Sequence, residues 1–272
     1  MKNNLLLLID FIRRLYKNRY MIRVMALREL KATYIGSLFG FFWAVINPLS
    51  QLLIYGIVFG IFFKSVPDPV YGTDSFLLFL LCGLIPWQFF SQTIASSTSV
   101  IVSNGNLIKK AVGFPSEVLP IVTMLSNLIS HLIGVILLIL ILILSTGTVN
   151  IYSPLVFVYL FLAAVFAVGL GWMLASLNVY LRDVQQMIGM ILMGWFFFTP
   201  VFYSPGIVPE KFLFFMKLNP IYHLIEGYRL ALLSGKCLLM QDFLYLAVIS
   251  FLTFLLGGAL FRKLKPGFAE IL

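Results

Sequence analysis

Six stretches of this chain are apolar over a length that can cross a lipid bilayer, and none of them contains an acidic residue. A spanning helix needs about 20 residues at roughly 1.5 Å of rise per residue, because the hydrocarbon core is about 30 Å thick. The stretches are 36–63, 75–102, 118–144, 154–181, 186–202 and 243–261. Transporters driven by ions or protons usually keep ionisable groups at membrane depth. The pattern therefore favours a passive conduit driven by a partner.

The composition indicates the same class of protein. Hydrophobic residues make up 61% of the chain, charged residues make up 11%, and the mean hydropathy is +1.03, which lies outside the range of soluble globular domains. We predict an all-α membrane protein with six transmembrane helices within residues 35–265. The fifth stretch is the shortest and contains Pro200, which predicts a helix that is broken or stops short of the far interface.

Lysine and arginine residues are distributed unevenly between the two sides that six spans would create. Fourteen of the 19 lie on the side of the two chain ends and five on the other, whereas the ten acidic residues divide equally. The positive-inside rule assigns the more basic side to the cytoplasm. We expect a multi-pass protein of the inner (cytoplasmic) membrane with both termini cytoplasmic. Its charge then reflects topology and contact with membrane lipids, and a nucleic acid partner is not needed to explain it.

Residues 1–34 contain charged and apolar positions that alternate with a helical period. Asp10, Arg13, Arg14 and Lys17 share one face, which predicts an amphipathic helix lying in the headgroup region. Two interpretations stay open: the helix is a simple topogenic anchor, or it also handles an anionic lipid substrate. Arginine suits the second role because its planar guanidinium binds phosphate through two hydrogen bonds. The candidate substrate-entry residues are Arg13, Arg14, Arg19 and Arg23.

Uncharged polar side chains repeat every three or four residues along three of the apolar stretches. They must face protein or water, because unsatisfied polar groups in hydrocarbon are costly. Interhelical hydrogen bonds would explain any one face, whereas three faces together favour a hydrated passage for a neutral, hydroxyl-rich cargo. Aromatic residues near the outer end of the fifth stretch fit an interfacial belt or stacking on sugar rings. The candidate lining residues are Gln88, Gln92, Ser99, Asn127, Trp195, Phe198 and Tyr203.

Other intramembrane residues fit packing better than chemistry. His131 is the one clearly titratable group at membrane depth, and a lone histidine is more often a hydrogen-bonded packing residue than a proton relay. Small residues at four-residue spacing, Ala163, Ala167, Gly171 and Ala175, predict close helix contacts within one chain or between subunits. We predict no catalytic residues and no metal site.

The segment 203–242, between the fifth and sixth stretches, is moderately apolar. Pro205, Pro209 and Pro220 interrupt it too often for a spanning helix. We expect short helices that lie at the outer membrane surface or dip back into it.

Several short motifs follow one another along nearly the whole chain. They are Arg28-Glu29-Leu30-Lys31, Asn47-Pro48-Leu49, Leu107-Ile108-Lys109-Lys110, Phe114-Pro115-Ser116-Glu117, Asn178-Val179-Tyr180-Leu181-Arg182-Asp183, Thr199-Pro200-Val201-Phe202-Tyr203, and Asn219-Pro220 with Glu226 and Arg229. With this set of motifs in this order, the chain resembles the transmembrane subunits of ABC-2 type exporters for cell-surface polysaccharides, the O-antigen, capsule and teichoic acid group.

The resemblance implies a half-transporter. Two copies of the chain would form the pore as a homodimer, and two copies of a cytoplasmic ABC ATPase would bind beneath it. ATP and Mg would bind that partner, so that this chain would be a transport subunit, not an enzyme, and would bind no cofactor. The sequence agrees, because it contains no G-x-x-x-x-G-K-[ST] loop. The implied cargo is a lipid-linked, O-antigen-like polysaccharide.

The resemblance also assigns roles to individual segments. The loop 103–117 would dock on the ATPase, and the N-terminal helix would frame a lateral entrance for a polyprenyl pyrophosphate-linked glycan. Residues 203–242 would form outer gate helices, and residues 266–272 a cytoplasmic tail. The candidate ATPase-coupling residues are Lys109, Lys110, Phe114, Pro115 and Glu117.

Two alternative functions stay open. The same architecture also suits export of a small lipid or a drug, and cargo-stimulated ATP hydrolysis would separate these two cargoes. A membrane enzyme such as a lipid glycosyltransferase or phosphatase would need convergent carboxylates, histidines or a metal site. Here the acidic residues are scattered singly and only two histidines occur, which argues against an enzyme.

Overall fold

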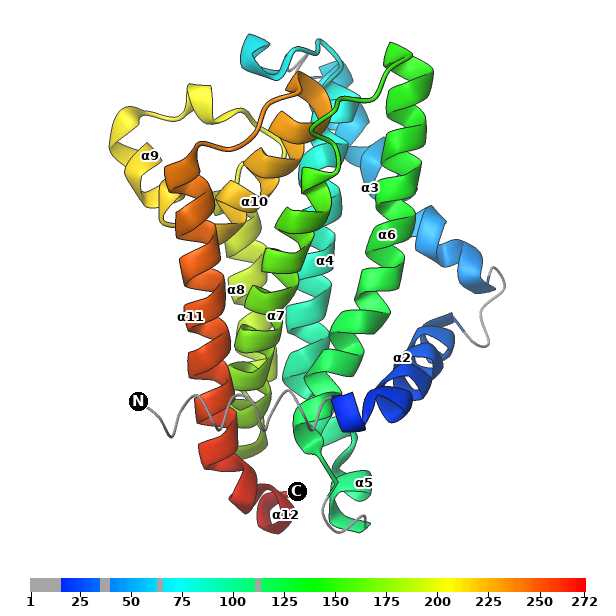
Figure 1. Ribbon diagram of the computed structural model, residues 1–272, viewed down its shortest axis with the longest axis vertical. Helices are drawn as coiled ribbons and strands as arrows, with labels where there is room; N and C mark the ends of the chain where they lie inside the picture. Colours follow the sequence, from blue (N-terminus) through cyan, green and yellow to red (C-terminus); the bar gives the residue numbers. More distant parts are fainter. Residues whose placement is uncertain (1–15, 35–39, 63–65, 111–113) are drawn as a thin grey trace.

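Four long helices form the body of the molecule. The computed structural model describes residues 16–34, 40–62, 66–110 and 114–272, and this part of the chain folds into helices and turns without a strand. The long helices stand side by side along the long axis (Figure 1), and each is long and apolar enough to cross a membrane. They are α4 (Phe76–Ser103), α6 (Leu119–Thr146), α7 (Leu155–Tyr180) and α11 (Met240–Leu264). They match the second, third, fourth and sixth predicted spans.

The first and fifth predicted spans are shorter or less regular. α3 (Trp43–Tyr55) continues directly into a π-helical segment, η2 (Gly56–Phe62), and together they cover most of the first apolar stretch. α8 (Val184–Phe198) has 15 residues and ends before Pro200. Thr199 is extended, with φ −107° and ψ 131°, because the ring of a following proline disfavours the helical region. α8 therefore ends at Phe198, just before Pro200, where the sequence predicts that the helix is broken.

The small residues on α7 serve packing inside one chain. Ala163, Ala167 and Ala175 are all buried, which lets neighbouring helices approach α7 closely. Trp172 of α7 lies against Phe254 of α11, with ring centroids 4.9 Å apart. α7 thus contacts both α4 and α11 and stands at the centre of the bundle.

The segment between α8 and α11 folds into short helices at one end of the bundle, called the α10 end below. α9 (Glu210–Lys217) is largely exposed, whereas every residue of α10 (Pro220–Arg229) is buried. Asn219 caps α10 by accepting a hydrogen bond from the backbone N–H of Ile221, which satisfies one of the free donors of the first turn. α10 packs against α4, α7 and α11. The expected short helices are present, and α10 folds back into the bundle.

The opposite end of the bundle carries exposed lysines and arginines and is called the basic end below. α2 (Arg19–Tyr34) rests there on α6, α5 (Gly105–Lys110) follows α4, and α12 (Phe268–Ile271) follows α11 through the turn η7 (Lys265–Gly267) (Figure 1). The exposed basic residues include Lys109, Lys110, Arg182, Arg262 and Lys263. The remaining short elements are η1 (Gly40–Phe42), η3 (Pro69–Tyr71), η4 (Ser116–Val118), η5 (Pro205–Ile207) and η6 (Leu230–Ser234).

Candidate functional site

The half of α4 nearer the basic end has one open side. Gln92 is exposed, and Gln88 and Ser99 are partly exposed, whereas residues 78–87 in the other half are all buried. Thr93, next to Gln92 on the helix, is also fully buried, so the open side is a narrow stripe. An uncharged polar stripe therefore begins near the middle of α4 and runs toward the basic end.

Part of the polar pattern on α4 and α6 serves helix packing. The hydroxyl groups of Ser97 and Thr123 lie 2.9 Å apart and join the two helices. Thr123 donates to the backbone oxygen of Pro120, so Ser97 is the donor in their shared bond. Thr98 donates to a backbone oxygen of its own helix and is fully buried. Asn127, in contrast, is partly exposed.

His131 joins three helices. Its Nδ1 lies 3.3 Å from the backbone oxygen of Ile85 on α4, and its Nε2 lies 2.9 Å from the hydroxyl of Tyr228 on α10. A carbonyl oxygen only accepts hydrogen bonds, which assigns the ring proton to Nδ1 and makes Tyr228 the donor to Nε2. These contacts support the interpretation of His131 as a packing residue.

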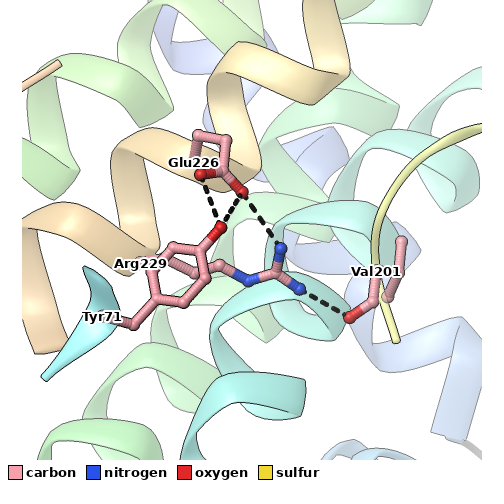
Figure 2. A network of polar contacts seen from close by, with 4 residues as sticks. All are labelled: Tyr71, Val201, Glu226 and Arg229. Carbon is pink, nitrogen blue, oxygen red and sulfur yellow. Dashed lines mark hydrogen bonds and ion pairs between the residues drawn. The ribbon is translucent and has the colours of Figure 1, made fainter. Parts of the chain in front are cut away.

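A buried charged network lies at the α10 end (Figure 2). Glu226 and Arg229 of α10 form an ion pair, with 3.1 Å between Oε1 and Nη1. The hydroxyl of Tyr71, in η3, lies 2.8 and 3.0 Å from the two carboxylate oxygens of Glu226. Arg229 also donates through Nη2 to the backbone oxygen of Val201 at 2.8 Å. The network joins α10 to the turn before α4 and to the turn after α8.

Burial fixes the protonation and the geometry of this network. Arg229 has no exposed surface, and its guanidinium carbon lies 3.6 Å from the ring centroid of Phe79 on α4. Burial, together with the nearby carboxylate, raises the pKa of Tyr71, so its hydroxyl stays protonated and donates. Gly83 is required beside the network, because a Cβ there would lie 2.7 Å from the backbone oxygen of Val201. The turn after α8 is thus held directly against α4.

The aromatic candidates near the end of α8 have different surroundings. Trp195 donates its indole N–H to the side-chain oxygen of Asn219 at 2.9 Å, which fastens α8 to the start of α10. Tyr203 donates to the backbone oxygen of Phe197 at 2.9 Å. Phe198 is 76% exposed. Among these three candidates, Phe198 is therefore the one whose side chain is mostly exposed.

Some of the candidate coupling residues are exposed, whereas one is buried and forms an ion pair. Lys109 and Lys110 are exposed at the end of α5, and Phe114 and Pro115 are partly exposed. Glu117 is buried, and its carboxylate forms an ion pair with Lys265 after α11. The two lysines thus present their charge to the outside, while Glu117 holds the loop to the rest of the bundle.

α2 lies on α6 through a small apolar contact. Ile22 and Ala26 are buried against Val118 and Val122, so the described part of the predicted interfacial helix is a helix with one covered face. Glu29 lies farther along α2, and burial raises the pKa of its carboxyl from 4.5 to about 7. The helix therefore carries a carboxyl group that changes charge near neutral pH.

The arginines proposed for substrate entry are only partly described by the structure. Arg19 and Arg23 are exposed on α2. Arg19 donates through Nη1 to the backbone oxygen of Tyr16 at 3.0 Å, and its guanidinium lies over the Tyr16 ring at 4.3 Å. Arg13 and Arg14 lie outside the described residues.

Comparison with known sequences identifies the family. The sequence pattern of the ABC-2 type transporter family matches residues 20–233, which is most of the chain. The chain belongs to the ABC-2 type transporter family. It is 29% identical over 266 residues to the O-antigen export system permease protein RfbA of Myxococcus xanthus, a match that covers 97% of this chain and 99% of that protein.

Two further relatives of this ABC-2 type chain align over most of their length. An O-antigen export system permease protein RfbA of Klebsiella pneumoniae is 29% identical over 257 residues, covering 90% of this chain and 92% of that protein. The polysialic acid transport protein KpsM of Escherichia coli is 25% identical over 245 residues, covering 89% and 92%.

The buried network of this ABC-2 type transporter is the part of the site that sequence reasoning did not find. Glu226 and Arg229 stand in one of the quoted motifs, but nothing there indicates that they are buried or that they pair. Their spacing of three residues is the signal that could have found the pair, because such residues share one helix face. Tyr71 is 155 positions from Glu226 and carries no comparable signal.

Proposed function

We propose that this chain is the transmembrane permease subunit of an ATP-driven ABC exporter that moves a lipid-linked cell-surface polysaccharide across the cytoplasmic membrane. Membership in the ABC-2 type transporter family supports a membrane transport subunit. The near full-length similarity to proteins named for O-antigen export and polysialic acid transport supports a polysaccharide as cargo. Both chain ends would be cytoplasmic, so that the basic end faces the cytoplasm.

The observation that carries the proposal is the difference between the two halves of α4. Gln88, Gln92 and Ser99 form a polar stripe that is open toward the basic end, whereas residues 78–87 are buried and Arg229 closes the α10 end. An uncharged polar surface suits a cargo rich in hydroxyl groups, which can exchange hydrogen bonds with water for hydrogen bonds with amides. Moving α10 away from α4 would break the buried network, and ATP hydrolysis would supply that energy.

The open stripe lies on one side of a single copy of the chain, which is a reason to propose a homodimer with two stripes facing one passage. α8 contacts α4, and only Ile188 and Leu192 among its 15 residues are buried. Each copy would contribute six spans, with α3 and η2 forming the first and α8 the fifth. The proposed lining residues are Gln88, Gln92, Ser99, Asn127, Trp195, Phe198 and Tyr203.

The basic end would receive both the energy source and the cargo. Two copies of an ABC ATPase would bind around α5, where Lys109 and Lys110 are exposed, and would carry ATP and Mg. The exposed guanidinium groups of Arg19 and Arg23 on α2 would hold the pyrophosphate of the lipid-linked glycan through charge-assisted hydrogen bonds. α9 and α10 would act as the outer gate.

Deletion and reconstitution test the proposed function. A strain that lacks the chain should lose its surface polysaccharide and regain it when the chain is supplied. In proteoliposomes that contain the chain and its ABC ATPase, lipid-linked glycan should stimulate ATP hydrolysis and cross the membrane. An ATPase variant without the phosphate-binding lysine is the control. Stimulation by a small lipid or a drug, but not by the glycan, would overturn the polysaccharide assignment and support the alternative exporter.

A further inference from the structure

The residues that follow α11 fasten the end of the bundle that carries α5. Lys265 forms an ion pair with the carboxylate of Glu117. The backbone oxygen of Glu117 accepts the indole N–H of Trp172, on α7, at 2.9 Å. Trp172 is itself only 1% exposed, so its position is fixed by the core. These bonds bring the start of α6, the middle of α7 and the end of α11 to one point beside the loop 103–117.

α12 adds an apolar contact at the same place. Phe268 is 1% exposed and packs in a cluster with Ile101 of α4 and Val179 of α7. Tyr180 donates its hydroxyl to the backbone at the end of α11 at 2.9 Å. A Cβ on Gly267 would meet that hydroxyl oxygen, so the side chain of Tyr180 lies directly against the turn into α12. The turn and the buried phenyl ring together direct α12 toward α5.

Leu272 extends this contact to α5. A Cβ placed on Gly105, the first residue of α5, would lie 3.5 Å from the Cβ of Leu272. None of the residues of α5 is buried, and α12 is its main neighbour in the described structure apart from adjoining residues. Ile108 of α5 is partly buried against the same cluster that contains Phe268, so the position of α5 depends on α12 together with that cluster.

We propose that Lys265, Phe268 and Leu272, termed the brace, position α5 so that movement of an ATPase bound there is passed to α7 and α11 as well as to α4. This inference rests on the function proposed above. α5 follows α4 directly along the chain, so α4 is the long helix that would follow its movement most directly. The brace adds a second connection through Glu117 and through the buried ring of Phe268, and such packed contacts are the physical means by which distant sites are coupled.

Alanine variants should separate ATP hydrolysis from transport. In proteoliposomes, Lys265→Ala and Leu272→Ala should still bind the ABC ATPase and hydrolyse ATP. The amount of glycan exported per ATP should fall by about two- to thirtyfold, the range that follows when coupling between sites is altered. Glu270→Ala, at an exposed position of α12, is the matched control and should leave the ratio unchanged. Glu117→Lys combined with Lys265→Glu re-forms the ion pair in reverse and should restore much of the lost ratio.

A reversible disulfide tests the position of the brace directly. Gly105→Cys and Leu272→Cys place two Cβ atoms about 3.5 Å apart, which is within the roughly 3.5–4.5 Å that disulfides span. Cys82 and Cys237 are first replaced by alanine. Reduced with dithiothreitol, this variant lacks the leucine contact and should export less glycan per ATP. Oxidised with copper phenanthroline, the same sample should recover the wild-type ratio.

Two outcomes separate failure of this inference from failure of the proposed function. If the wild-type complex exports glycan but every brace variant keeps its ratio of export to hydrolysis, and oxidation of the disulfide variant changes nothing, the brace has no positioning role. If the wild-type complex itself shows no ATP-dependent export of glycan, the proposed function is wrong.

Discussion

Arg229 is a fully buried cation at the α10 end, and its charge is compensated by three neighbours. The carboxylate of Glu226, the backbone oxygen of Val201 and the ring of Phe79 each compensate part of its charge. A buried ion pair adds little net stability compared with well-packed apolar side chains, but loss of one partner leaves an uncompensated charge. Geometry, more than stability, is therefore what this network contributes: it holds α10, α4 and the turn after α8 in one arrangement.

Single and double substitutions in the network should lower the stability of the chain by different amounts. Glu226→Leu leaves Arg229 buried without its anion and should destabilise the chain by about 3–5 kcal/mol. Tyr71→Phe removes one hydrogen bond to a charged group and should cost about 1.5–3 kcal/mol. Thermal unfolding in lipid nanodiscs measures both effects, with Glu210→Gln, at an exposed site, as control. Glu226→Leu combined with Arg229→Met removes both charges and should be less damaging than Glu226→Leu alone; the reverse order would contradict the pairing.

Glu29 should make the contact between α2 and α6 depend on pH. Burial raises the pKa of its carboxyl from 4.5 to about 7, so the packed helix favours the neutral form. The contact is strongest below pH 4.5, weakens as the pH rises from 4.5 to about 7, and stays constant above that. Spin labels on Val24→Cys and Ile151→Cys, both exposed, should give a broader distance distribution at about pH 8 than at about pH 5. If the Glu29→Gln variant still shows this difference between the two pH values, a group other than Glu29 causes it.

At the scale of whole helices, α4 offers the sharpest test, because its two halves differ in exposure. In a background without Cys237, Gln92→Cys and Ser99→Cys should react with a water-soluble thiol reagent that is supplied from the basic end. Thr93→Cys and Leu81→Cys should be protected, because these positions are 0% and 4% exposed. Mass spectrometry of the labelled chain measures the reaction. Equal protection of all four positions would favour plain helix packing over a hydrated passage.

The long helices could be predicted from the sequence, whereas the burial of α10 could not. Hydropathy identifies a span because side chains at membrane depth are mostly apolar, while the helix satisfies the hydrogen bonds of its own backbone. The end of α8 follows from Pro200 by local sterics. α10 lies in a segment of mixed composition that contains several prolines, so no local signal indicates that it is buried. Its burial results from contacts with α4, α7 and α11, which only the fold brings together.

The candidate coupling site shows the same division. Lys109 and Lys110 could be predicted to be exposed, because they lie in a short polar loop between two spans. The ion pair of Glu117 could not be predicted, because its partner Lys265 is 148 positions away. α12 has four residues, too few to form a stable helix alone, and it depends on the burial of Phe268. The sequence therefore suggested a tail where the structure has a packed element.

For the molecule as a whole, the two ends of the bundle carry different kinds of polar groups. The α10 end contains a buried pair of opposite charges whose hydrogen bonds are made within the chain. The basic end presents exposed cations on α2, α5 and α11 and the open end of the α4 stripe. A cargo with an anionic headgroup and a neutral glycan would therefore meet attraction at the basic end and a closed structure at the other. With the orientation proposed above, such an arrangement would favour entry from the cytoplasm and would make release the step that needs energy.

Substitution of arginine by lysine separates recognition of the headgroup from general attraction to anionic lipid. A basic residue near the membrane surface contributes about 1 kcal/mol whether it is arginine or lysine. Only arginine offers the planar fork that binds a phosphate through two hydrogen bonds. Within the described residues, Arg19 donates through Nη1 to Tyr16, and Nη2 is the nitrogen that could turn to a ligand. The variant replaces Arg13, Arg14, Arg19 and Arg23 together.

If these arginines recognise the pyrophosphate, the quadruple lysine variant should lose glycan export while membrane insertion and assembly with the ATPase stay normal. Glycan export is measured as surface polysaccharide in cells, and insertion and assembly by copurification of the complex. Arg28→Lys, at another exposed position of α2, is the control for a change of side chain alone and should export normally. Unchanged export in the quadruple variant would rule out recognition by these residues, because the charge alone would then suffice, and would leave α2 the role of a topogenic anchor.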